Sequence, residues 1–427
     1  MAFATPASRD LFESDYRAAL VKCNEATTPK TRKSKAKIVN LWYEYCKEVH
    51  QSLALRDITD PEARLSHLLA FGLRYRRGGQ TGKPVRAGTV KKALLAVGQG
   101  ITHLGLSDPR KLSGSSDFHP LLVSFFKTLE DEDGPATRAY PANITILQGI
   151  LEALEFEHDV HGPFNRHVLD LCIIGFFWLL RPPEYLYSSP EEARSQAFLL
   201  SHIYLTMDGG VFPALLAPLN DESDLVRLTH ANLEFSDQKN AVKGERIGHQ
   251  ATDDPNFCPA KALGHIALRL KRAGATHDRK IHEFYYEAQN KWVNTKPSHV
   301  TNALRHSAKL LEHVTGIDPA HISARSLRPG GATALLCACV DKDSVQLLGR
   351  WKSDAMLRYL RIQAAIHSHH YAQRMLDHGK YTFAPQALST HGAMVPIQAP
   401  RIVQILTGAL AHDEVYDYSD DEADQDS

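Results

Sequence analysis

The sequence predicts a mainly α-helical protein with a small antiparallel β-sheet, arranged as an N-terminal helical bundle and a larger C-terminal domain. Three observations predict this fold. Apolar residues recur at helical spacing through most of the chain. Strand-like segments are concentrated between about residues 198 and 250, where Met207-Asp-Gly-Gly210 is a strong hairpin signal. The acidic segment Glu130–Thr137, which contains Gly-Pro, separates two helical blocks as a linker would.

The N-terminal block shows five segments with helical periodicity, which cover residues 10–23, 38–49, 61–73, 89–104 and 121–129. Two basic stretches lie beside these helices, and such stretches can follow a DNA backbone. Their alternative interpretation is solvated helix ends. The candidate DNA-binding residues are Lys30, Arg32, Lys33, Lys35, Lys37, Arg76, Arg77, Lys83, Arg86, Lys91 and Lys92.

The domain boundaries follow from these patterns. We expect a helical domain over residues 1–130, a linker over 131–142 and a second domain over 143–385. Residues 386–427 form a tail whose acidic end is expected to be disordered.

The second domain opens with a helix over residues 144–157, followed by a strongly apolar helix over 165–180. This helix ends at Arg181, and Glu184 is a natural partner because a buried charge is costly without one. A simple Arg–Glu pair that fixes a helix end is the alternative interpretation.

Strands are expected over residues 198–206, 211–216 and 225–235, with a turn over 237–246. Helices are expected over 258–272 and 298–314. The segment 273–297 is interpreted as a loop with a strand-like piece, Ile281–Tyr286.

The stretch from Arg325 to Tyr359 combines short helices with chemically active side chains. Arg325 and Arg328 precede Pro329, which suits the first turn of a helix. Either Asp341 or Asp343 can cap a second helix that Gly349 ends, and Ser353 can cap a third that carries Tyr359. This unit could gather its arginines and its tyrosine around one anion, although solvated arginines and a packed tyrosine are the alternative.

These segments together resemble the tyrosine recombinases of the phage-integrase family, and most of all those of Crypton and DIRS-like eukaryotic mobile elements. The resemblance covers roughly residues 140–375. Its motifs are F-F-W-L-L-R-P-P-E-Y, a lysine on a hairpin turn, S-L-R-P-G-G-A-T and L-G-R-W-K-S-D-A-M-L-R-Y. It implies a core-binding N-terminal domain and a catalytic C-terminal domain. The implied catalytic residues are Arg181, Lys239, Arg325, Arg328, Arg350, Trp351 and Tyr359, with Glu184 in support and Lys243 as the alternative to Lys239.

The implied activity is site-specific DNA recombination or integration through a 3′-phosphotyrosine intermediate. Arginines would neutralise the phosphate, Tyr359 would attack it, and Lys239 would protonate the leaving 5′ oxygen. The implied partner is double-stranded DNA, held by a homotetramer at synapsis, and no cofactor is required.

Two positions depart from the family pattern. Arg325 stands where the family usually has histidine, and Leu348-Gly349-Arg350 stands where it has Leu-Gly-His or Leu-Gly-Trp. Either Arg350 or the next residue, Trp351, could supply the hydrogen bond of that corner. The departures keep open a catalytically inactive DNA-binding protein derived from such an element. A type IB topoisomerase-like enzyme shares the chemistry, but no sequence feature favours it.

Composition agrees with binding to nucleic acid. The chain has 427 residues and no net charge, but eight of its last fifteen residues are acidic. The remainder has 49 basic and 41 acidic residues, and a modestly basic body suits a nucleic-acid partner.

The remaining sequence features predict location. The six cysteines form no zinc-like spacing, so we expect reduced thiols and no metal. His367-Ser-His-His-Tyr371 is interpreted as a polar helix face. The longest apolar run, Leu171–Leu180, is too short to span a membrane, and the N-terminus resembles no secretory signal. An intracellular protein is expected, nuclear if eukaryotic.

Overall fold

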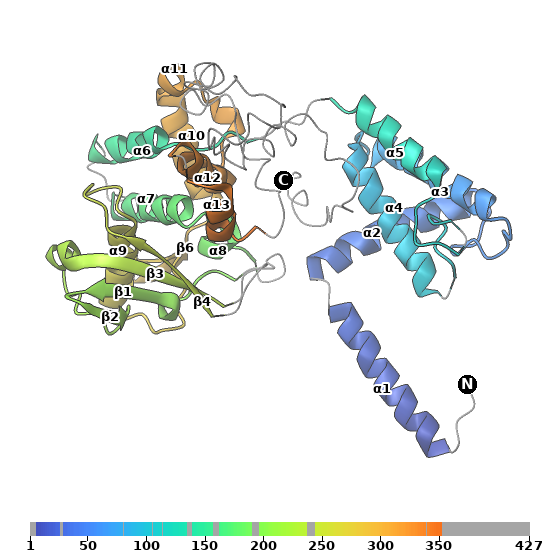
Figure 1. Ribbon diagram of the computed structural model, residues 1–427, viewed down its shortest axis with the longest axis horizontal. Coiled ribbons are helices and arrows are strands. Elements are labelled where there is room, and N and C mark those ends of the chain that lie inside the picture. The colour runs from blue at the N-terminus through green and yellow to red at the C-terminus, as the bar shows by residue number, and fades with distance from the viewer. Residues whose placement is uncertain are drawn as a thin grey trace, which may run out of the picture. The chain divides into compact units, whose positions relative to one another are not determined.

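The computed structural model describes residues 6–25, 29–79, 81–104, 106–112, 114–134, 139–156, 162–189, 196–236, 244–338 and 340–351. Their elements confirm the predicted fold class, which is mainly α-helical with a small antiparallel sheet (Figure 1). The chain divides into two compact units between Ala136 and Thr137. Each unit has its own hydrophobic core.

The named elements of the N-terminal unit, in its described residues, are all helices. Its helices are α1 (Pro6–Glu25), α2 (Pro29–Glu48), α3 (Pro61–Gly78), α4 (Ala87–His103) and α5 (Pro120–Glu132). Trp42 of α2 and Phe71 of α3 pack edge to face in its core, with ring centroids 5.2 Å apart. Asp60 caps α3 by accepting hydrogen bonds from the backbone N–H groups of Glu62 and Ala63, and Pro61 suits the first helical position.

Helix α2 begins earlier than the sequence pattern indicated, because the basic stretch is itself helical. Its Lys, Arg and Ala residues are good helix formers, so they extend the amphipathic segment towards Pro29. The basic side chains therefore lie along a helix instead of a preceding loop.

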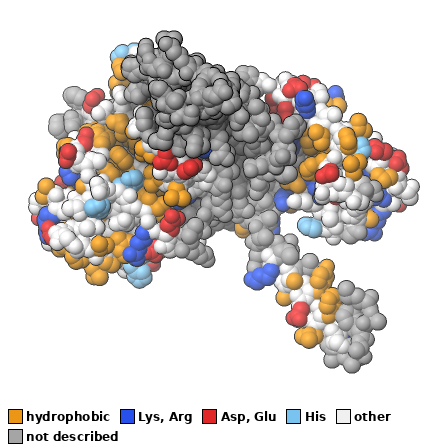
Figure 2. Space-filling model, in the orientation of Figure 1, with side chains coloured by type: hydrophobic (Ala, Val, Ile, Leu, Met, Phe, Trp, Pro, Cys, Tyr) orange, Lys and Arg blue, Asp and Glu red, His pale blue; other side chains and the backbone are white. Residues whose placement is uncertain are grey.

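Helix α1 exposes hydrophobic side chains between residues 11 and 16. Leu11, Phe12 and Tyr16 are exposed, and the rings of Phe12 and Tyr16 stack on each other. Figure 2 shows hydrophobic and charged side chains side by side on this helix.

Only part of the acidic segment Glu130–Thr137 can be a linker. Helix α5 continues through Glu132, and Asp133 accepts a hydrogen bond from the backbone N–H of Ala87 at 2.9 Å. Asp133 also pairs with Arg76, so this carboxylate belongs to the N-terminal unit.

The C-terminal unit packs helices around two small antiparallel sheets. Its helices are α6 (Ile144–Phe156), α7 (Gly162–Phe177), α8 (Pro182–Tyr185), α9 (Pro259–Arg272), α10 (Pro297–Leu310), α11 (Glu312–Thr315), α12 (Leu327–Cys337) and α13 (Lys342–Gly349). Helix α7 is buried along most of its length and packs against α6, α9, α10 and α12.

The larger sheet has the strand order β2-β1-β3-β4, formed by β1 (Ile203–Met207), β2 (Gly210–Pro213), β3 (Leu228–Phe235) and β4 (Glu245–Gln250). The β1–β2 hairpin confirms the Asp-Gly-Gly signal, with Met207 paired to Gly210. The indole N–H of Trp178, just after α7, donates to the carbonyl of Ile247 on β4 at 2.9 Å. This bond fixes the sheet to the end of α7.

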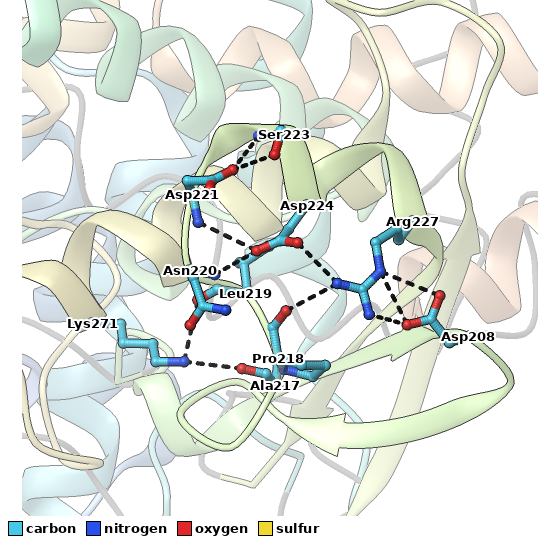
Figure 3. Close-up of polar contacts among 10 residues, drawn as sticks. All are labelled: Asp208, Ala217, Pro218, Leu219, Asn220, Asp221, Ser223, Asp224, Arg227 and Lys271. Atoms are coloured by element: carbon cyan, nitrogen blue, oxygen red, sulfur yellow. Dashed lines mark hydrogen bonds and ion pairs between the residues drawn. The ribbon is translucent and has the colours of Figure 1, made fainter.

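Strand β3 begins at Leu228, later than expected, because the 3₁₀ helix η2 (Glu222–Arg227) precedes it. Figure 3 shows how polar contacts hold this connection. Arg227 pairs with Asp224 at 2.9 Å and with Asp208 of the β1–β2 turn. Lys271 of α9 donates to the carbonyls of Ala217 and Leu219 at 3.0 and 3.2 Å.

The interpretation of residues 273–297 as a loop with a strand-like piece was confirmed in part, because a strand lies within Ile281–Tyr286, but its partner strand was not expected. The segment contains a second hairpin, formed by β5 (Glu283–Tyr286), the 3₁₀ turn η3 (Glu287–Gln289) and β6 (Lys291–Asn294). Asn290 closes it in the left-handed conformation, which asparagine adopts more readily than most residues. Strand β6 is too short for alternation to be visible in sequence.

Two short 3₁₀ helices, η4 (Pro319–His321) and η5 (Ala324–Ser326), lead into α12, while η1 (Leu200–His202) leads into β1. Asp341, not Asp343, caps α13, since its carboxylate accepts from the N–H of Ser344 at 2.7 Å.

Among the described residues, no helix combines the length and apolar character that crossing a membrane requires.

Candidate active site: an arginine cluster around Glu184

Glu184 is the centre of a buried polar cluster in the C-terminal unit. Helix α8 positions it, because Pro182 and Pro183 pre-set the first turn after Arg181. Its Oε2 accepts from the backbone N–H of Arg181 at 2.8 Å, and its Oε1 accepts from Arg181 Nη1 at 3.1 Å. The sequence prediction that Arg181 pairs with Glu184 is confirmed.

Arg350, which lies 166 positions later in the sequence, binds the same carboxylate. Its Nη2 lies 3.2 Å from Glu184 Oε2, and its Nη1 lies 3.5 Å from Oε1. Burial alone would raise the pKa of Glu184, but the charges of Arg350, Arg181 and Arg328 outweigh burial and hold the pKa below its ordinary value. Glu184 is therefore ionised at neutral pH.

The backbone at Leu179 supplies a second meeting point. Leu179 follows α7 with φ of 50°, a left-handed conformation that is rare for leucine. Its carbonyl accepts from Arg328 Nη1 at 2.8 Å and from Arg350 Nη2 at 3.2 Å. Helix α7 was predicted to reach residue 180, but it ends at Phe177, and the turn after it presents this carbonyl to the arginines.

Arg350 also adopts the left-handed conformation, with φ of 58°. Gly349 was expected to follow the last helical residue as a left-handed glycine cap, but it is itself the last residue of α13, and Arg350 takes the cap. Gly349 is needed for another reason, since a Cβ there would lie 1.6 Å from the Trp351 ring.

Two aromatic rings cover the guanidinium groups. The Cζ atom of Arg328 lies 4.3 Å from the centroid of the Trp351 ring, and that of Arg350 lies 4.0 Å from the centroid of Phe235. Such cation–π contacts are strongest where water is excluded. Arg328 Nη2 also donates to the carbonyl of Gly349 at 2.5 Å, which ties α12 to the end of α13.

A pair of glycines lets α12 bring Arg328 to this point. A Cβ on Gly330 would lie 1.9 Å from the carbonyl oxygen of Ala142, and one on Gly331 would lie 2.1 Å from that of Phe176. Only hydrogen fits between these backbones, so the Gly-Gly of the motif is explained by close approach.

Of the other predicted catalytic residues, Arg325 lies in the part of the chain that the structure describes. Arg325 lies in η5 with an exposed side chain. Lys239, Lys243 and Tyr359 lie outside the described residues, as does Ser353. Tyr371 and Tyr381, the next candidates for the nucleophile after Tyr359, also lie outside them. The structure thus brings together Arg181, Glu184, Arg328, Arg350 and Trp351.

The candidate DNA-binding residues of the N-terminal unit differ in their surroundings. Arg76 is engaged by Asp133 and the carbonyl of Val85, Lys91 by Glu130, and Lys35 by Gln99. Lys30 and Lys92 are partly buried. The exposed members are Arg32, Lys33, Lys37, Arg77, Lys83 and Arg86.

Sequence reasoning missed two members of the cluster. The carbonyl of Leu179 has no sequence signal, because nothing in a leucine indicates a left-handed backbone. Phe235 was assigned to a strand end, and only the packing of β3 beneath Arg350 shows its second role.

The chemistry of this arrangement suits an oxyanion. The four bonded side chains carry three positive charges and one negative charge, and guanidinium groups match the geometry of phosphate oxygens. Among the described residues, no group of His, Cys, Asp and Glu is arranged to hold a metal ion.

Comparisons with known proteins give similar solved structures only. No protein-family model matches the sequence. No curated protein matches it. The Tn1549 transposon integrase in complex with transposon right-end DNA aligns over 80% of this chain and 99% of that chain, with 9% identity and a TM-score of 0.41. The same integrase with circular-intermediate DNA covers 78% and 97%, with 10% identity and a TM-score of 0.38.

The XerA recombinase aligns over 80% of this chain and 98% of its own, with 12% identity and a TM-score of 0.32. At these low TM-scores and identities, a functional conclusion has to come from the residues of the site.

Proposed function

We propose that this protein breaks and rejoins DNA at specific sites through a 3′-phosphotyrosine intermediate, as a tyrosine recombinase of the integrase type. One observation carries the proposal. Arg181 and Arg328, from motifs far apart in the sequence, join one network through Glu184, Arg350 and the carbonyl of Leu179. The motif resemblance predicts that these two arginines share one phosphate.

The residues divide the chemistry as follows. Arg181 and Arg328 stabilise the negative charge that develops on the phosphate during transfer. Tyr359 attacks the phosphorus and expels the 5′ oxygen of the next nucleotide, so that the phosphodiester energy is kept in the protein–DNA bond. Lys239, or Lys243 in its place, gives that oxygen its proton.

The N-terminal unit provides the non-specific part of DNA binding in this proposal. Exposed cations on α2 and in the segment between α3 and α4 contact phosphates, and the assembly on DNA is a homotetramer. An element-encoded recombinase of the Crypton or DIRS type acts in the nucleus, which is the location we propose.

The alternative is an element-derived protein that binds DNA without cutting it. Arg325 favours this alternative, because it occupies the place of the family's histidine and a guanidinium is always protonated. It therefore cannot take the proton of a tyrosine.

A covalent trapping experiment tests the proposal. Nicked duplexes carrying the ends of the element that encodes the chain are incubated with the full-length protein. The nick lets a short fragment diffuse away, so a covalent adduct accumulates and is seen as a slower band under denaturing conditions. We expect an adduct with the wild type and none with Tyr359→Phe.

Two tyrosine variants serve as matched controls. Tyr371→Phe and Tyr381→Phe should form the adduct as the wild type does. DNA binding without any adduct would support the alternative. An adduct that persists in Tyr359→Phe and disappears in either control would identify a different nucleophile.

A further inference from the structure

Arg350 is bound into the cluster more fully than the motif resemblance explains. It reaches both oxygens of Glu184, the carbonyl of Leu179 and the ring of Phe235, and only 8% of its side chain is exposed. These partners come from α8, the turn after α7 and the end of β3. One side chain therefore joins three elements.

The hydrogen bonds form an ordered chain between the two phosphate-binding arginines. Each oxygen of Glu184 accepts one bond from Arg181 and one from Arg350. Arg350 and Arg328 then share the carbonyl of Leu179. Arg350 thus links Arg181 to Arg328.

Backbone conformation points to the same link. Leu179 and Arg350 are both non-glycine residues with positive φ, and Arg350 Nη2 donates to the Leu179 carbonyl at 3.2 Å. Such conformations cost free energy and persist where surrounding contacts enforce them, often at functional sites. Here two of them meet in a single hydrogen bond.

We propose that Arg350 is a positioning residue, which sets the distance between Arg181 and Arg328 and anchors both to the sheet through Phe235. This role rests on the proposed function, because the arginines that Arg350 positions are those proposed to bind the phosphate. In this assignment Arg350 acts through Glu184 and Leu179 and does not contact DNA. Arg350, with its left-handed backbone, occupies the position that histidine or tryptophan has in the Leu-Gly-His or Leu-Gly-Trp motif of the family.

The first test needs no DNA. The side-chain Nε–H signal of Arg181 is assigned by its disappearance in Arg181→Lys and then followed by NMR in Arg350→Lys, which keeps the charge but lacks the fork. We expect this signal to shift or broaden in Arg350→Lys and in Phe235→Leu. Arg246→Lys is the matched control, because Arg246 also covers an aromatic ring, Tyr204 at 3.7 Å, and pairs with a carboxylate, Glu234 at 2.7 Å.

An unchanged Arg181 signal in folded Arg350→Lys would overturn the proposal. Circular dichroism establishes that each variant is folded. Because this test involves no cleavage, its outcome does not depend on whether the protein forms an adduct.

The second test uses DNA in which a neutral methylphosphonate replaces the phosphate at the cleaved position. Removal of an arginine that contacts the phosphate is partly compensated on this DNA, because there is less charge to neutralise. We expect Arg350→Lys to slow adduct formation by about 10- to 100-fold, as misplaced catalytic groups do, on both DNAs alike. We expect the rate of adduct formation by Arg181→Ala to recover in part on the methylphosphonate DNA.

If the rate of adduct formation by Arg350→Lys recovers on methylphosphonate DNA as much as that of Arg181→Ala, Arg350 contacts the phosphate. That result would overturn the positioning role. If the wild type forms no adduct on either DNA, the proposed function fails, and the NMR measurement alone decides the role of Arg350.

Discussion

Arg328 Nη1 donates a 2.8 Å hydrogen bond to the backbone carbonyl of Leu179, a residue 149 positions earlier in the chain. This bond joins the helix of the second arginine motif to the turn that precedes the first. A backbone carbonyl carries no formal charge, so the bond orients the Arg328 guanidinium without neutralising it.

Glu184→Gln should destabilise the C-terminal unit strongly. The substitution keeps the shape of the side chain but leaves Arg181 and Arg350 without their shared carboxylate, and breaking a buried ion pair costs about 3–5 kcal/mol. Urea unfolding followed by tryptophan fluorescence measures the change. The control Glu234→Gln, at the more exposed pair with Arg246, should cost at most about 1 kcal/mol. Equal losses of stability in the two variants would contradict the central role of Glu184.

Gly331→Ala should weaken the packing of α12. The new Cβ would lie 2.1 Å from the carbonyl oxygen of Phe176, and overpacking of this kind costs about 1–3 kcal/mol. Gly78→Ala is the control, because nothing lies within 4 Å of a Cβ at that position. Urea unfolding should show reduced stability for Gly331→Ala only, and a Gly331→Ala protein as stable as the wild type would refute the close approach.

Acid should destabilise the C-terminal unit well above the range in which carboxylates titrate. Burial lowers the pKa of His167 to about 3, and the pKa values of His249 and His282 to about 4. Below about pH 6.5 these histidines take up protons in the unfolded chain but not in the native one. Each therefore lowers the free energy of unfolding by about 1.4 kcal/mol per pH unit as the pH falls towards its native pKa.

His249→Phe isolates one of these contributions. His249 packs edge-on against Trp178, with ring centroids 4.6 Å apart, so phenylalanine can occupy its place. Urea unfolding between pH 7.5 and 5 should show a pH dependence reduced by about one proton relative to wild type. The same slope in both proteins would mean that His249 is not held neutral.

The double variant Lys33→Gln/Lys37→Gln should weaken DNA binding without destabilising the protein, because both lysines are exposed on α2. For each of the two lysines that neutralises a phosphate, the slope of log K, the logarithm of the DNA-binding constant, against log salt concentration should become less steep by about 0.9. Fluorescence anisotropy at several salt concentrations measures this slope. Lys127→Gln, an exposed position on α5, is the control and should leave it unchanged. An unchanged slope in the double variant would place the DNA-binding surface elsewhere.

Prediction from sequence was most successful where structure depends on near neighbours. Helix periodicity and the β1–β2 turn are local features that were visible in the sequence, and the α13 cap Asp341 was one of the two residues predicted for it. It was least successful at ends of elements. The onset of β3 was misplaced and β6 was not expected. The cap of α13 falls on Arg350, whose side chain is held by the distant residues Glu184 and Leu179.

Local sequence was enough to specify the helical class, the sheet hairpin and the pairing of Arg181 with Glu184, since these two residues are three apart and helix geometry brings them together. Long-range packing was needed for Arg350 to share that carboxylate across 166 positions of sequence. The same packing turns the Leu179 carbonyl towards two arginines and places Phe235 under one of them. These relationships depend on how α7, α12 and β3 pack, and packing is a property of the whole unit that no local pattern encodes.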